Sequence, residues 1–180
     1  EKLRELVASG KVVILENARH KNLTPKGVGK DLAIKVNANL GTSPERVDIE
    51  MELEKLRMAV EAGADTVMDL STGGDLDEIR KTIIAHSRIP IGTVPIYQAA
   101  VEAIKKKNAI TNLDPEELFE VIEKHGQDGV DFITVHAGVT RRSLERLKKQ
   151  GRITDIVSRG GAFLAEWMIV NNREKPLYEQ

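Results

Sequence analysis

Short apolar runs alternate with amphipathic helical stretches along most of the chain. The runs are apolar at consecutive positions, as in Phe132–Val135, which is typical of parallel strands covered on both faces. The runs that predict strands are Ala33–Leu40, Asp65–Leu70, Pro90–Ile96, Asp131–Ala137 and Asp155–Ser158. Strands that alternate with helices in this way predict an α/β fold with a parallel sheet.

The helical stretches carry start and stop signals. Ser43 before Pro44 predicts a helix N-cap followed by a first-turn proline, and Gly63 predicts the end of that helix. Asp114 predicts the cap of a second helix in the same manner. The last helix is predicted over Gly161–Asn172, with an apolar face that needs a partner surface.

The first 32 residues have a different pattern. Val12–Leu15 predicts a strand, whereas Asn17–Gly29 is rich in polar residues and glycine and predicts a loop. We therefore expect an N-terminal segment over residues 1–32 and a series of βα units over residues 33–180.

The predicted strand ends favour a closed barrel over an open sheet. Nearly every run leads into small or polar residues, such as Asn37–Asn39, Ser71–Gly74 and His136–Gly138. In a (β/α)8 TIM-type barrel all these ends meet at one active-site face, whereas in an open sheet only the ends beside the switch point do. About five βα units are fewer than the eight that a barrel needs. With Glu1 in place of an initiator Met, this predicts a piece of a longer chain.

Composition narrows the class of protein. The chain has 27 Lys and Arg against 28 Asp and Glu, a net charge of −1, which argues against nucleic acid or a membrane surface as partner. No apolar run approaches the ~18 residues of a membrane-spanning helix. The absence of cysteine excludes disulfides, zinc–thiolate sites and iron–sulfur ligation within these residues.

Two glycine-containing turns are candidate phosphate sites. Ser158, Arg159, Gly160 and Gly161 combine a hydroxyl, a guanidinium and accessible backbone N–H groups, all of which suit a phosphate, although such a turn is also common in plain loops. Gly73–Gly74 precedes a predicted helix and offers backbone N–H groups, but a tight structural turn explains it better.

Several other polar side chains are candidates for ligand contact. His136 ends a predicted strand, where a catalytic and a structural role are about equally expected. Asn37 and Asn39 point the same way from one strand, either to read a ligand or to seal a barrel end. Tyr97 follows Pro95 and either stacks on a ligand or packs.

The other polar side chains and Met68 point less directly to ligand contact. Asp69 is predicted to be a hydrogen-bond anchor, and the pattern alone places Met68 in the core. His86 and His125 are predicted on a helix surface or at a helix end. His20 shares no metal-binding spacing with either of them.

Taken together, the motifs are far more specific than any one of them. Five segments occur in order: Lys35–Ser43, Gly63–Gly74, Pro90–Gln98, Thr134–Gly138 and Ile156–Gly161. This series resembles the phosphomethylpyrimidine synthase (ThiC) family of thiamine biosynthesis, over roughly residues 10–180.

The resemblance implies a radical enzyme built on a (β/α)8 barrel. The family rearranges 5-aminoimidazole ribonucleotide to 4-amino-5-hydroxymethyl-2-methylpyrimidine phosphate, using S-adenosylmethionine cleaved at a [4Fe–4S] cluster. The substrate-binding positions that it implies are Asn39, Met68, Tyr97, His136, Ser158, Arg159 and Gly160. A methionine beside an imidazole or adenosyl ring would supply a soft apolar contact.

The resemblance also implies parts that this sequence lacks. The cluster cysteines and two zinc-ligand histidines of the family lie toward the C-terminus, so we expect these 180 residues to hold neither group and to be inactive alone. For the intact protein the resemblance implies a homodimer in the cytoplasm. The alternative is a non-catalytic or different phosphate-binding barrel protein with the same strand-end motifs.

Overall fold

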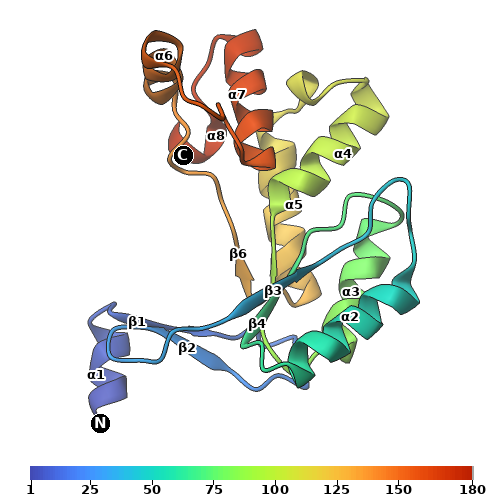
Figure 1. Cartoon of the computed structure of the whole chain (residues 1–180), viewed down its shortest axis with the longest axis vertical. Coiled ribbons are helices and arrows are strands. Elements are labelled where there is room, and N and C mark those ends of the chain that lie inside the picture. Colours follow the sequence, from blue (N-terminus) through green and yellow to red (C-terminus); the bar gives the residue numbers. More distant parts are fainter. Residues whose placement is uncertain (180) are drawn as a thin grey trace. The chain divides into compact units, whose positions relative to one another are not determined.

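The computed structural model describes residues 1–179 and divides the chain into two compact units. Unit 1 comprises Glu1–Thr93 and Glu123–Ile133, and unit 2 comprises Val94–Ile122 and Thr134–Gln180. Figure 1 labels most elements of both units. The fold is mixed α/β, and its main sheet is parallel.

Unit 1 begins with a helix and a hairpin. Helix α1 (Lys2–Ala8) precedes strand β1 (Val12–Leu15), which pairs antiparallel with β2 (Lys26–Gly29). The strand predicted over Val12–Leu15 is therefore confirmed. The loop predicted over Asn17–Gly29 is wrong at its end, because Lys26–Gly29 pairs with that strand although two of its four residues are glycine.

The main sheet of unit 1 contains four parallel strands in the order β3-β4-β5-β6. These are β3 (Asn37–Leu40), β4 (Thr66–Asp69), β5 (Ile91–Thr93) and β6 (Phe132–Ile133). Each lies within a run that predicts a strand, so the parallel sheet is confirmed. The fifth run, Asp155–Ser158, forms no strand, and that prediction was wrong.

Helices α2 (Ile49–Glu61) and α3 (Leu76–His86) lie next to each other along this sheet (Figure 1). Their apolar faces and one face of the sheet form a single buried core: Leu40, Leu56, Val67, Ile79, Ile83, Ile84, Ile89, Ile91 and Val130. Leu40, Val67 and Ile91 alternate with the residues of the other face, because successive strand side chains point to opposite sides. The row Asn39–Met68–Gly92–Phe132 therefore lies on the face opposite the core.

Gly92 makes room for a side chain of the neighbouring strand. A Cβ atom there would lie 2.3 Å from the Phe132 ring. Any larger residue would displace that ring, so the glycine lets it lie against β5.

The start of α2 differs from the prediction. Asp48, not Ser43, is the N-cap, and its side chain accepts a hydrogen bond from the Met51 amide at 3.0 Å. Ser43 instead exchanges backbone hydrogen bonds with Arg46 in a tight turn. A proline after a serine fits such a turn as well as a helix start.

Unit 2 is helical. It contains α4 (Pro95–Lys107), the 3₁₀ turn η1 (Ile110–Asn112), α6 (Arg141–Gln150), α7 (Arg159–Asn171) and α8 (Pro176–Glu179). The division between the units falls within α5 (Pro115–Asp128). The helix start predicted at Asp114 is confirmed, since its carboxylate accepts the Glu116 amide.

Helix α7 finds its apolar partner within unit 2. Leu164, Trp167 and Met168 are buried, and the Trp167 indole N–H donates to the carbonyl of Leu113 at 2.9 Å. The apolar face predicted for the last helix is thus covered by α4, α6 and η1.

Candidate functional site

The predicted site residues divide between the two units. Asn39 and Met68 belong to unit 1, where they are partners on adjacent parallel strands. Tyr97, His136 and the segment Ser158–Gly160 belong to unit 2.

In unit 1, the asparagine pair lies on the face of the sheet opposite the core. The Asn37 amide donates to the Asn39 side-chain oxygen at 2.9 Å, and the Thr66 hydroxyl donates to Asn37 at 2.9 Å. The shared direction predicted for the two asparagines is confirmed. Met68 is half-buried on the same face, so its placement in the core by pattern alone was wrong.

Asp69 is the anchor that the sequence predicts. Its side chain is buried and faces the core side of β4, and one carboxylate oxygen accepts both the Ser71 amide and the Ser71 hydroxyl. Burial raises the pKa of Asp69, against the lowering effect of these two hydrogen bonds. The carboxylate fixes the turn that follows β4.

Gly73 has a structural role in that same turn. A Cβ atom at Gly73 would lie 2.2 Å from the Ser43 carbonyl oxygen, and the Gly73 carbonyl accepts the Thr42 hydroxyl. This close backbone packing supports the interpretation of Gly73–Gly74 as a tight turn.

In unit 2, the segment predicted to hold phosphate opens helix α7. Ser158 is the N-cap, and its hydroxyl accepts the Gly161 amide at 3.2 Å. Arg159 and Gly160 are the first residues of the helix, where N–H groups have no intrahelical acceptor and the helix dipole favours an anion. The donors therefore come from a helix N-terminus and not, as predicted, from a strand end.

Tyr97 lies in the first turn of α4, because Pro95 begins that helix instead of ending a strand. The Arg159 guanidinium stands over the Tyr97 ring, 5.0 Å from its centroid. The Phe163 ring meets the same tyrosine edge-on at 6.5 Å. Tyr97 thus positions the exposed arginine at the start of α7 through a cation–π contact.

His136 lies in the loop after β6, not at the end of a strand as predicted. Its ring packs against Gly160, since a Cβ atom at that glycine would lie 2.3 Å from the His136 Cε1 atom. The His136 Nδ1 atom is buried and has no hydrogen-bond partner in the described part of the chain. Burial, followed by the charge of Lys175, lowers the pKa of this imidazole, which favours the neutral ring.

The other buried histidines have partners for both ring nitrogens. In His125, Nε2 faces the Arg80 guanidinium at 3.1 Å and Nδ1 faces the Thr93 hydroxyl at 2.8 Å. In His20, Nδ1 faces Asp131 at 2.7 Å and Nε2 faces the Ser87 carbonyl at 3.1 Å. His125 lies in the last turn of α5, which confirms the predicted helix end, but it is not on the surface, because only 3% of it is exposed.

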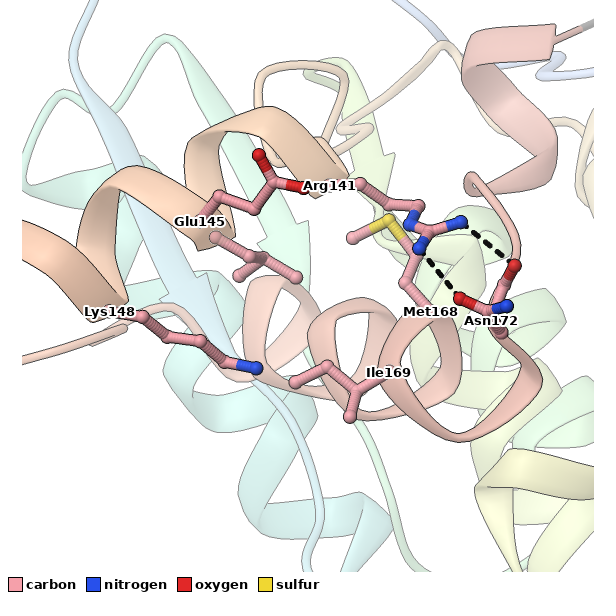
Figure 2. A pocket seen from close by; sticks show the side chains of 7 residues that line it. Arg141, Glu145, Lys148, Met168, Ile169 and Asn172 are labelled. Atoms are coloured by element: carbon pink, nitrogen blue, oxygen red, sulfur yellow. Dashed lines mark hydrogen bonds between the residues drawn. The ribbon is translucent and has the colours of Figure 1, made fainter.

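Among the hollows lined by described residues, two lie beside α6 in unit 2. One, of about 190 Å³, lies between α6 and α7, and Figure 2 shows the Arg141 guanidinium bonded there to the Asn172 carbonyl and side-chain oxygens. The other, of about 490 Å³, lies beside α6 and includes Gly138 and Ser158 in its lining. Its size suits a small molecule, and it borders the start of α7.

The described residues do not supply a metal or cluster site. The sequence has no cysteine, and within residues 1–179 no three His, Asp or Glu side chains gather closely enough to hold a metal ion. Over the same residues, no helix is long and apolar enough to cross a membrane.

Comparison with known proteins places these residues in a family. A family model described as the radical SAM ThiC family matches residues 1–180. The phosphomethylpyrimidine synthases of Carboxydothermus hydrogenoformans and Desulforamulus reducens are 58% and 57% identical over 180 residues. A 5-hydroxybenzimidazole synthase BzaB of Moorella thermoacetica is 52% identical over 180 residues.

Each alignment covers all of this chain but only 42% of the relative, so the chain spans less than half the length of these relatives. The match of the family model over the whole chain agrees with the resemblance carried by the five sequence segments. The chain belongs to the radical SAM ThiC family.

Proposed function

We propose that unit 2 binds the phosphate end of 5-aminoimidazole ribonucleotide in a phosphomethylpyrimidine synthase. The buried His136 Nδ1 atom carries this proposal, because buried polar atoms almost always have a partner and this one has none in the described chain. A ligand that enters beside Gly160 would supply that partner.

The donors around this atom suit a phosphate. Arg159 offers a guanidinium that matches phosphate oxygens, and the first turn of α7 offers backbone N–H groups. The Tyr97 ring below the guanidinium limits its freedom, so less rotamer entropy is lost when the phosphate binds.

We propose that Asn39 and Met68 of unit 1 are residues that recognise a nitrogen-rich ring or a ribose. An asparagine carries both a donor and an acceptor, which suits an aminoimidazole edge or ribose hydroxyls. Met68 would offer a soft apolar surface to a flat ring. Their register on adjacent strands, away from the core, supports this role.

We also propose that the four parallel strands are part of a (β/α)8 barrel in the longer protein. Their spatial order follows their chain order, which is the arrangement in a barrel, and no reversal of strand order occurs among β3–β6. A cytoplasmic location and a homodimer are proposals that rest on the resemblance alone.

The activity proposed for the intact protein is the conversion of the ribonucleotide to 4-amino-5-hydroxymethyl-2-methylpyrimidine phosphate. The residues described here are assigned to binding and orientation only. The family implies S-adenosylmethionine and a [4Fe–4S] cluster, and the resemblance implies zinc, but these residues provide no ligand set for either metal group.

A second activity is suggested by the relative named 5-hydroxybenzimidazole synthase, which is 52% identical over the whole chain. The test is incubation of the intact, reconstituted protein with 5-aminoimidazole ribonucleotide and S-adenosylmethionine, followed by mass spectrometry. The pyrimidine phosphate is the expected product. A hydroxybenzimidazole would support the second activity, and ligand binding without turnover would support a non-catalytic protein.

A further inference from the structure

Lys175 is a fully buried lysine between α7 and α8. None of its surface is exposed, and its ammonium donates to the carbonyl oxygens of Ala137, at 2.5 Å, and Val139. Lysine is almost never fully buried, since removing an ammonium group from water is costly unless hydrogen bonds compensate it. The two carbonyl acceptors provide that compensation.

The neighbouring Glu174 fastens the same turn from its other end. One of its carboxylate oxygens accepts the backbone N–H of Arg141 at 3.0 Å, and the other accepts the backbone N–H of Lys175 at 3.0 Å. Consecutive side chains thus hold a short turn, residues 137–141, at three backbone groups. That turn separates His136 from helix α6.

His136 depends on this turn for its position. Its Nδ1 atom has no partner, so that atom contributes nothing to the orientation of the ring. Packing against Gly160 limits the movement of the ring on one side. The backbone at Ala137 is bonded to His136 and so sets the position from which its side chain extends. A displacement of the turn would therefore move the imidazole directly.

Charged, titratable and aromatic groups lie around the ammonium. The Glu174 carboxylate is adjacent, the Tyr178 ring lies 5.4 Å from the Lys175 nitrogen, and His136 senses the lysine charge. Burial lowers the pKa of Lys175 and Glu174 opposes that shift. The positive charge also lowers the pKa of His136, so the ammonium helps to keep the imidazole neutral.

We propose that Lys175 is a positioning residue of the substrate site: its ammonium holds the Ala137–Val139 turn so that the His136 ring stays seated against Gly160. This inference rests on the proposed function for its consequence in catalysis. Its geometric part concerns the ligand-free protein and is tested independently.

The test uses Lys175→Met in the intact protein, because methionine fills the space but cannot donate to the two carbonyls. The first readout is the His136 ring signal in NMR without ligand. We expect its pKa to rise and its line to broaden as the ring samples several positions. The second is affinity for 5-aminoimidazole ribonucleotide, which should fall about 10- to 100-fold when a contacting group is misplaced.

Lys148→Met is the matched control. Lys148 lies on α6 in the same unit, and its exposed side chain lines the hollow between α6 and α7 (Figure 2), away from the Ala137–Val139 turn in sequence. This variant should leave the His136 signal and the affinity unchanged. If Lys175→Met fails to fold, Lys175→Gln takes its place, since the neutral amide retains a donor for one carbonyl while losing the charge.

An unchanged His136 signal and unchanged affinity in a folded Lys175 variant would overturn the proposal and leave Lys175 with a purely structural role. If the wild-type protein does not bind the ribonucleotide, the proposed function fails. The His136 signal still decides the positioning role in that case, because it is recorded without ligand.

Discussion

The two units differ in whether the buried ring nitrogens of their histidines have hydrogen-bond partners. In unit 1, His20 and His125 each have both ring nitrogens within hydrogen-bond distance of a partner, and both side chains are nearly inaccessible. In unit 2, His136 keeps one buried nitrogen without a partner. This difference is the observation behind our proposal that a ligand binds beside His136.

The two units also differ in the surroundings of an arginine. Arg80 in unit 1 is 2% exposed and is bonded to Asp77, Asp128 and His125. Arg159 in unit 2 is exposed and rests on the face of Tyr97, with no acid bonded to it in the described contacts. The first guanidinium holds the fold together, whereas the second is available to an anion.

The largest expected effect comes from breaking the buried hydrogen-bond network around Arg80 in unit 1. Arg80→Met leaves the Asp128 carboxylate and the His125 ring without their central partner, and we expect a loss of about 3–5 kcal/mol in the free energy of unfolding. Hydrogen exchange of α3 and β5 amides in the intact protein would measure this loss locally.

Lys81→Met is the control for Arg80→Met. Lys81 is exposed and reaches Asp128 only at 3.6 Å, so its loss should cost less than about 1 kcal/mol. Similar losses for both variants would show that the buried network does not stabilise unit 1.

The second largest expected effect is a dependence of the folding stability on pH, which His125 causes. Burial and the Arg80 charge lower its pKa from 6.5 to about 3. Between these values the unfolded chain binds a proton that the folded chain excludes, so stability falls as the pH drops from 6.5 towards 3. The expected slope is up to about 1.4 kcal/mol per pH unit.

His125→Gln isolates this contribution, because glutamine can still accept from Arg80 and donate to Thr93 without titrating. Unfolding of the variant in urea should depend less steeply on pH than unfolding of the wild-type protein between pH 6 and pH 4.5, by roughly the same ~1.4 kcal/mol per unit. Parallel curves would contradict a buried neutral His125.

The smallest expected effect on stability is that of His136. His136→Asn removes no hydrogen bond at Nδ1. The free energy of unfolding, measured by thermal unfolding, should therefore change by less than about 1 kcal/mol. His20→Asn should cost more, because it removes the ring that bridges Asp131 and the Ser87 carbonyl. A larger cost at His136 than at His20 would reverse our assignment of structural and ligand-binding histidines.

The sequence predicted the sheet well because its signal is local. In β4 the consecutive residues Val67 and Met68 are both apolar, and such a pair marks a strand covered on both faces regardless of its neighbours. Asp155–Ser158 has a similar pattern but forms no strand, since strand formation also needs a partner. Asp155 there has a left-handed φ of 46° and Val157 is 75% exposed.

The site was predictable in its residue types but not in its geometry. The donors of Ser158 and Arg159 could be read from the sequence, whereas their place at the start of α7 could not, because the preceding run looked like a strand. Lys175 was missed altogether. Its burial depends on the carbonyls of Ala137 and Val139, far from it along the chain, and no local pattern indicates that contact.

Arg159 and the start of α7 are the groups that we propose to bind a phosphate. The most direct measurement compares the affinities of the intact protein for 5-aminoimidazole ribonucleotide and for the same nucleoside without phosphate, in the wild type and in Arg159→Met. Arg142→Met, on the exposed surface of α6, is the control and should leave both affinities unchanged. We expect Arg159→Met to weaken ribonucleotide binding by about 1.5–3 kcal/mol, roughly 10- to 150-fold, and to leave nucleoside binding nearly unchanged. Equal weakening for both ligands, or none for either, would contradict the account.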